Sequence, residues 1–212
     1  MISMMKIKSL TNAPDRAGRY RLVFEDDAVM RLYRQTVEDF GLYAGKELSD
    51  DELAKLKVSA GEMSAKMRAV RIISASSVSK RDLEQRLVQK GEDPQQAKAA
   101  VAWMSEMSLL DDRKTAEQIV ARSIAKGYGL ARAKQALYEK RIPKELWDEA
   151  LADYPEQIDK IMEYLESHLG DNPEPKEIKR AIDALMRRGH SYGKIRKAML
   201  EMAMDSQDFP EG

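Results

Sequence analysis

The strongest constraint on the fold is an internal repeat of about 50 residues. Three blocks align without a gap: LEQRLVQKGEDPQQAKAAVAWM (83–104), AKQALYEKRIPKELWDEALADY (133–154) and AIDALMRRGHSYGKIRKAMLEM (181–202). Leu87, Leu137 and Leu185 coincide in this alignment, and each block has the pattern of a helix, a tight turn and a second helix. A unit this short buries too small a fraction of its surface to be stable alone, so the repeats are expected to stack.

A further helical stretch precedes each block, at 65–76, 116–127 and 159–170. The repeating unit is therefore predicted to contain three helices. We expect a mainly α fold of three tandem three-helix repeats in an elongated, curved array, preceded by a small N-terminal β-hairpin or sheet segment. The predicted division of the chain is an N-terminal segment with short helices, the three repeats and a tail, at 1–61, 62–112, 113–155, 156–205 and 206–212.

The turn within each block has a local explanation. Gly91 and Gly189 stand where a helix must end in a left-handed residue, a conformation that glycine adopts without strain. Arg141 occupies the equivalent position of the second block, and we expect it to force a different turn, with Pro143 at the start of the next helix. Asp93 and Ser191 have the residue types and positions of N-caps of the third helices.

The first 60 residues have a different pattern. KIKSL and RYRLVFE alternate in polarity around the turn residues TNAPDRAG, which predicts a β-hairpin with Tyr20, Leu22 and Phe24 on one face. The next apolar stretch, AVMRLY, is equally compatible with a third strand and with the start of a helix. Ser49 and Glu52 form a capping-box pattern, which predicts that a helix starts there.

Composition excludes several functions. The chain has no cysteine and only two histidines, so we expect no metal site. The first ten residues lack the apolar core of a signal peptide, and no stretch approaches the roughly 20 apolar residues of a membrane span. We find no Gly-rich phosphate loop and no nucleophile motif, and therefore predict a cytoplasmic protein that is not an enzyme, needs no cofactor, has no membrane association and is a monomer.

Basic residues are concentrated at the same phase of each repeat, although 36 basic and 36 acidic residues give a formal net charge of zero. Seven basic residues stand against two acidic ones in 65–90, and seven against one in both 122–144 and 179–197. One such cluster would be an ordinary solvated helix face. Recurrence at equivalent positions suggests a positively charged stripe that could contact phosphates or acidic protein groups.

Four runs of the sequence resemble the RecX family of bacterial regulatory proteins. They are GLYAGKELSDDEL, LEQRLVQKG with AVAWMSEMSLLDD, AEQIVARSIAKGYGLARAKQALYEKRI and AIDALMRRGHSYGKIRKAM, and the resemblance covers nearly the whole chain. His190 departs from it, since an aromatic residue is commoner there. The resemblance implies binding to the RecA recombinase and its nucleoprotein filament, and inhibition of ATPase, co-protease and strand-exchange activities, with effects on DNA repair and recombination.

The candidate residues for contact with RecA or DNA are the cations of the three clusters: Arg68, Arg71, Arg81, Arg86, Arg122, Lys126, Arg132, Lys134, Arg187, Arg188, Lys194 and Lys197. Two other functions are compatible with the same residues. One is a DNA-binding protein with tandem helix-turn-helix modules, because Ser191 opens a basic helix. The other is a helical-repeat adaptor for a different protein.

Overall fold

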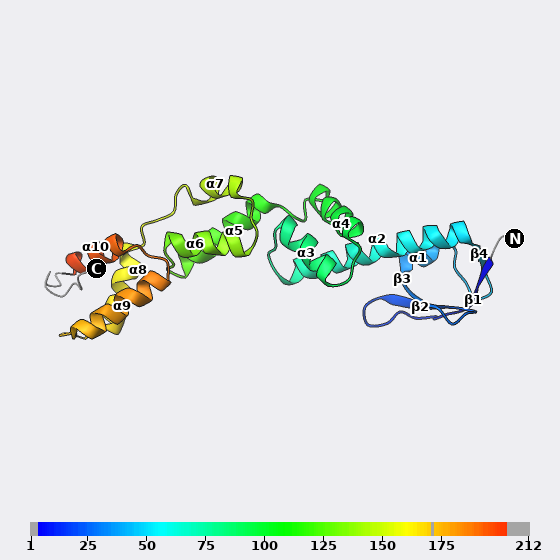
Figure 1. Ribbon diagram of the computed structural model, residues 1–212, viewed down its shortest axis with the longest axis horizontal. Coiled ribbons are helices and arrows are strands. Elements are labelled where there is room, and N and C mark those ends of the chain that lie inside the picture. Colours follow the sequence, from blue (N-terminus) through cyan, green and yellow to red (C-terminus); the bar gives the residue numbers. More distant parts are fainter. Residues whose placement is uncertain (1–3, 171, 203–212) are drawn as a thin grey trace. The chain divides into compact units, whose positions relative to one another are not determined.

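A computed structural model describes residues 4–170 and 172–202, which form two compact units with a boundary between Leu110 and Asp111. Each unit is described by itself below, with elements labelled as in Figure 1. The fold is mainly helical with a four-stranded sheet in the N-terminal part, as predicted. The predicted tail, 206–212, lies outside the described residues.

The sheet of the first unit is antiparallel and has the order β3-β2-β1-β4. Its strands are β1 (Met4–Leu10), β2 (Arg19–Phe24), β3 (Val29–Tyr33) and β4 (Glu47–Ser49). The predicted hairpin is thus confirmed, and AVMRLY contributes strand β3, after which α1 (Arg34–Asp39) begins at once. Leu22 and Phe24 are buried on the expected face. Strand β4 has three residues, too few for an alternating pattern to predict it.

The long helix α2 (Asp50–Ala75) belongs to two hydrophobic cores. It starts at the predicted capping box, in which the Ser49 amide donates to Glu52 Oε2 at 2.8 Å. Its Leu56 packs beneath the sheet, whereas Ala65 and Ala69 pack in the first repeat. The predicted end of the N-terminal segment, residue 61, lies in the middle of α2. The division of the chain into domains stays a prediction.

Three helix triplets follow the sheet and confirm the predicted repeat. The first combines the second half of α2 with α3 (Lys80–Gln89) and α4 (Pro94–Glu106). The second contains α5 (Asp112–Ala125), α6 (Leu130–Glu139), a 3-10 turn (Lys144–Leu146) and α7 (Trp147–Leu151). The third contains α8 (Ile158–His168), α9 (Pro175–Arg187) and α10 (Tyr192–Glu201). Each triplet has its own apolar cluster, centred on the aligned leucines.

The turn within each repeat is the same in all three. The amide after the left-handed residue donates to the aligned leucine carbonyl: Glu92 to Leu87 at 3.1 Å, Ile142 to Leu137 at 3.0 Å, and His190 to Leu185 at 3.2 Å. A second bond closes each turn, from the amide of Gly91, Arg141 or Gly189. This pair of bonds is the Schellman motif that ends many helices.

The expectation that Arg141 forces a different turn was wrong. Arg141 adopts φ 55°, in the same left-handed region as Gly91 and Gly189 at φ 89°. This conformation costs a non-glycine residue on the order of 1–2 kcal/mol. The two hydrogen bonds of the turn and the burial of Ile142, which is 4% exposed, offset that cost. The helix start after the turn does differ, because Pro143 precedes a 3-10 turn there, whereas Asp93 and Ser191 cap α4 and α10 as predicted.

A main-chain junction joins the second and third repeats within the second unit. The amide of Gly129 donates to the Arg188 carbonyl at 2.9 Å, and the amide of Ala131 donates to the Gly189 carbonyl at 3.2 Å. Gly129 has no side-chain cap to offer to α6, so the carbonyls of Arg188 and Gly189, directly after α9, take over that role. A Cβ at Gly129 would lie 2.1 Å from the Gly189 carbonyl oxygen, so only glycine permits this approach.

Gly189→Ala is expected to destabilise the protein more than Gly91→Ala. Both residues have φ 89°, but a Cβ at Gly91 meets nothing within 4 Å, whereas one at Gly189 would lie 2.3 Å from the Arg132 nitrogen. Gly91→Ala should cost only the left-handed strain, about 1–2 kcal/mol, and Gly189→Ala at least about 2 kcal/mol more. Urea denaturation followed by circular dichroism checks this, and equal costs would contradict the junction.

Candidate partner-binding surface

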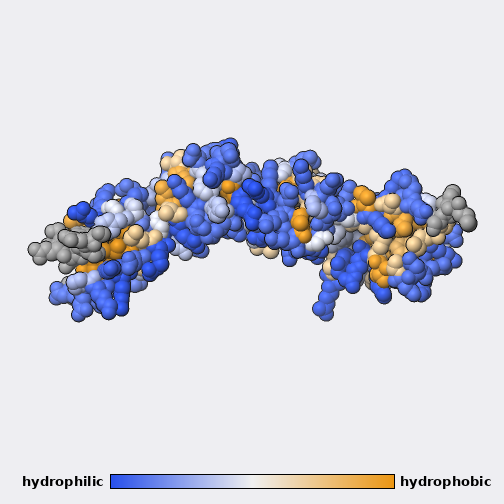
Figure 2. Space-filling view, in the orientation of Figure 1, coloured by the Kyte–Doolittle hydropathy of each residue, from blue (hydrophilic) through white to orange (hydrophobic). Residues whose placement is uncertain are grey.

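Hydrophilic residues cover most of the face shown in Figure 2, which makes charged side chains the main candidates for partner contact. In the first unit, two of the predicted cations belong to ion pairs. Arg68 lies 2.5 Å from Glu92, a carboxylate that is 8% exposed and also accepts a hydrogen bond from Ser64. Arg86 pairs with Asp82, one turn earlier on α3, at 3.0 Å. These two arginines neutralise buried acids of their own unit.

The other two predicted cations of the first unit differ from each other. Arg71 donates to the Met67 carbonyl at 3.2 Å and to the Tyr33 hydroxyl, and so connects α2 to strand β3. Arg81 is exposed on α3. Three of the four predicted contact residues of this unit therefore have a role within the fold.

In the second unit, four of the predicted cations line two pockets at the main-chain junction. Lys126 and Arg188 line the first, a pocket of about 350 Å³ that includes Gly127. The Lys126 ammonium lies 5.9 Å from the ring centre of Tyr128, and the Arg188 guanidinium 4.8 Å from that of Tyr164. Aromatic faces attract cations, so these rings position both side chains.

Lys134 and Lys194 line the second pocket, of about 270 Å³, together with Gly129 and Gly189. Its lining also includes the carboxylate of Glu156, which pairs with Lys197 at 3.2 Å. The pocket forms because the junction brings the N-termini of α6 and α10 together. Sequence spacing could not predict this meeting, since Lys134 and Lys194 are 60 positions apart.

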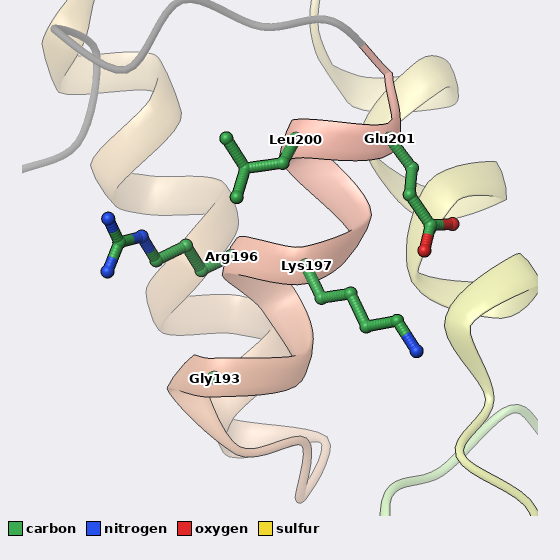
Figure 3. A pocket seen from close by; sticks show the side chains of 5 residues that line it. All are labelled: Gly193, Arg196, Lys197, Leu200 and Glu201. Carbon is green, nitrogen blue, oxygen red and sulfur yellow. The ribbon is translucent and has the colours of Figure 1, made fainter.

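The remaining predicted cations lie on exposed helix faces. Arg132 pairs with Glu139 at 3.3 Å, whereas Arg122 and Arg187 are exposed on α5 and α9. On α10, a shallow hollow follows one helical stripe, where Lys197 and Glu201 extend to one side and Arg196 and Leu200 to the other (Figure 3). The exposure of Leu200 gives this stripe an apolar component beside its charges.

His190 is a buried residue that the sequence interpretation missed. It is 5% exposed, its Nε2 lies 3.0 Å from the Gly127 carbonyl oxygen, and its buried Nδ1 has no partner among the described residues. A carbonyl only accepts, so Nε2 carries the proton. Burial lowers the pKa of His190 below 6.5, the hydrogen bond to Gly127 opposes this, and the charges of Arg188 and Lys194 add to the lowering.

A signal for this burial exists in the repeat alignment. His190 follows the left-handed residue, as Glu92 and Ile142 do, and all three are buried. The residue after a Schellman glycine commonly packs against its own helix. Alignment of the three turns could therefore have identified His190 as an interior side chain.

No helix in 4–170 or 172–202 is long and apolar enough to cross a membrane. In the same ranges, no group of three or more His, Cys, Asp or Glu residues is arranged to hold a metal ion.

We expect His190 to make the protein less stable in mild acid. The unfolded chain takes up a proton near pH 6.5, but the folded-state pKa is lower, so the free energy of unfolding falls as the pH drops from 6.5 toward that pKa. His190→Gln should show a smaller loss of stability between about pH 7.5 and about pH 5 in urea titrations. The control His168→Gln removes an exposed imidazole and should keep the wild-type loss. Equal losses in wild type and His190→Gln would contradict this role.

Arg68 is expected to contribute to stability, whereas Arg81 is not. Arg68→Ala leaves the buried Glu92 carboxylate with only the Ser64 hydroxyl, which should lower the free energy of unfolding by about 1–3 kcal/mol. Arg81→Ala is the matched change of an exposed arginine and should stay within about 0.5 kcal/mol of wild type. Thermal or urea denaturation measures both, and similar values would show that the pair with Glu92 is unimportant.

Comparison with known proteins gives one consistent family. The family model described as RecX, second three-helix domain, matches residues 111–151, which contain α5 to α7. The regulatory protein RecX of Vibrio parahaemolyticus is 27% identical over 146 residues, covering 68% of this chain and 94% of that protein. The regulatory protein RecX of Streptococcus gordonii is 23% identical over 193 residues, covering 89% of this chain and 75% of that protein.

A solved structure supports the same fold. The crystal structure of a regulatory protein RecX superimposes with a TM-score of 0.62 at 19% identity, covering 91% of this chain and 99% of that one. The family model covers the second helix triplet. The relatives and the solved structure together cover most of the chain, including both units. The chain is thus similar in sequence and fold to regulatory proteins of the RecX family over most of its length.

Proposed function

We propose that this protein regulates the RecA recombinase by binding RecA and the RecA–DNA filament. It restrains the ATPase, co-protease and strand-exchange activities of the filament and thereby influences DNA repair and recombination. It acts in the cytoplasm, as a monomer and without catalysis of its own. The similarity to RecX regulatory proteins over most of the chain supports this function.

The observation that carries the proposal is the group of four cations at the main-chain junction. Lys126, Lys134, Arg188 and Lys194 come from two repeats and line two neighbouring pockets. Within the described part of the chain, none of them forms a salt bridge with a carboxylate. Their charge is therefore available to acidic groups of RecA or to DNA phosphates, which the paired arginines of the first unit are not.

The proposed contact surface is accordingly centred on the second unit. It comprises the four junction cations together with the exposed cations of α5, α6, α9 and α10: Arg122, Arg132, Arg187 and Lys197. Arg81 is the matching exposed cation of the first unit. Arg68, Arg71 and Arg86 stabilise the fold, and their contribution to binding is proposed to be small.

The RecA-catalysed, DNA-dependent ATPase tests the function. Wild-type protein should inhibit it, and Lys134→Glu with Lys194→Glu should raise the half-inhibiting concentration by about fivefold to tenfold, because two favourable charge contacts are replaced by repulsion. The control Lys176→Glu with Lys179→Glu makes the same charge change at two exposed positions of α9 and should inhibit like wild type. Circular dichroism verifies helical content.

Three outcomes would contradict parts of the proposal. No effect of the wild-type protein on the ATPase would remove RecA regulation as its function. Inhibition by the Lys134 and Lys194 variant that equals wild type at low and at moderate salt would remove this pocket from the contact surface. Sequence-dependent binding to duplex DNA without RecA would favour a DNA-binding protein with helix-turn-helix modules instead.

A further inference from the structure

The pocket at Gly127 has a composition that the second pocket lacks. We call it the Gly127 pocket; its lining includes Lys126, Lys160, Glu163, Tyr164, His168 and Arg188. It thus combines three cations with one carboxylate and two aromatic rings. Lys160 and Glu163 pair with each other at 2.7 Å, so their charges cancel. Lys126 and Arg188 supply the net charge of about two that remains in the pocket.

The two remaining cations are positioned without any carboxylate. Arg188 lies over the Tyr164 ring and Lys126 over the Tyr128 ring, and no salt bridge with either exists among the described residues. A ring holds a cation through its face and accepts none of the N–H hydrogen bonds at the guanidinium edge. The Arg188 fork is therefore oriented and still able to donate to a planar or tetrahedral oxyanion, for which phosphate is a good match.

An exposed ring stack lies in the same pocket. The rings of Tyr164 and His168 are 3.9 Å apart with an interplanar angle of 16°. The His168 ring is fixed in orientation, since Nδ1 donates to the Tyr164 carbonyl at 2.8 Å. Tyr164 is half-buried, whereas His168 is exposed. His168 is thus the outer member of the stack, and a further flat ring could extend it.

We propose that the Gly127 pocket binds single-stranded nucleic acid: Lys126 and Arg188 hold a backbone phosphate, and a base stacks on His168. Single-strand binding sites combine a basic groove with exposed aromatic rings, and base stacking is tolerant of sequence. An acidic peptide would use the two cations but not the ring stack, so the pocket favours nucleic acid. The inference rests on the proposed function and specifies which component of the filament this pocket contacts.

Fluorescence anisotropy with a short labelled oligothymidine, without RecA, tests the phosphate contact. Lys126→Gln with Arg188→Gln should weaken binding and reduce the slope of log affinity against log salt by about 0.7, because the two cations hold one phosphate and each single-strand phosphate contact contributes about 0.7. The control Lys176→Gln with Lys179→Gln removes two exposed charges of α9 and should keep the wild-type slope. An unchanged slope in the Lys126 and Arg188 variant would overturn the phosphate contact.

His168→Ala tests the stacking contact separately. It should weaken binding to oligothymidine by about fivefold or more with an unchanged salt slope, since stacking releases no counterions. Binding to an abasic strand of equal length should be the same in His168→Ala and wild type. Equal weakening on both strands would show a merely structural role for His168 and overturn the stacking contact.

Competition identifies the class of ligand. Unlabelled oligothymidine should displace the labelled strand at a much lower concentration than polyglutamate of equal charge. Displacement at equal concentrations would mean that the pocket takes any polyanion, an acidic protein surface included, and would overturn the assignment to nucleic acid.

The RecA ATPase distinguishes this inference from the function on which it rests. The strand-binding measurements contain no RecA, so their failure with intact ATPase inhibition would remove the pocket and leave RecA regulation in place. Strand binding as expected, without any ATPase inhibition, would leave the strand-binding pocket in place and remove RecA regulation.

Discussion

The candidate surface depends on two main-chain hydrogen bonds, from Gly129 to Arg188 and from Ala131 to Gly189. They join the end of one helix to the start of another that is about 60 residues away in sequence, and they satisfy amide and carbonyl groups that would otherwise lack a partner. Lys126 and Lys134 are near one side of this contact in sequence, and Arg188 and Lys194 near the other. Without the junction the four cations would have no common location.

The repeat pattern predicted most of the architecture because local rules determine it. Helix periodicity, N-caps and the glycine stop at Gly91 and Gly189 act within a few residues, and the structure confirms them. The turn at Arg141 was predicted wrongly because glycine is preferred at a left-handed helix end but is not required there. Two hydrogen bonds and a buried neighbour are enough to hold a non-glycine residue there.

The candidate site was less predictable because it depends on contacts between distant residues. Charge counts placed Arg68 and Lys126 in equivalent clusters. Arg68, however, forms a salt bridge with Glu92, 24 residues away, whereas Lys126 lies over an aromatic ring. Neither partner follows from periodicity. The burial of His190 was recoverable in principle from the aligned turns, but its hydrogen bond to Gly127, 63 residues away, was not.

The long helix α2 has a consequence for how the chain can be divided. Its first half completes the core beneath the sheet and its second half completes the first repeat, so the two cores share one continuous hydrogen-bonded rod. A chain shortened to begin at residue 62 would lose the cap at Ser49 and expose amide groups in mid-helix. The N-terminal sheet and the first repeat are therefore parts of one unit that shares α2, and they cannot be separated without interrupting this helix.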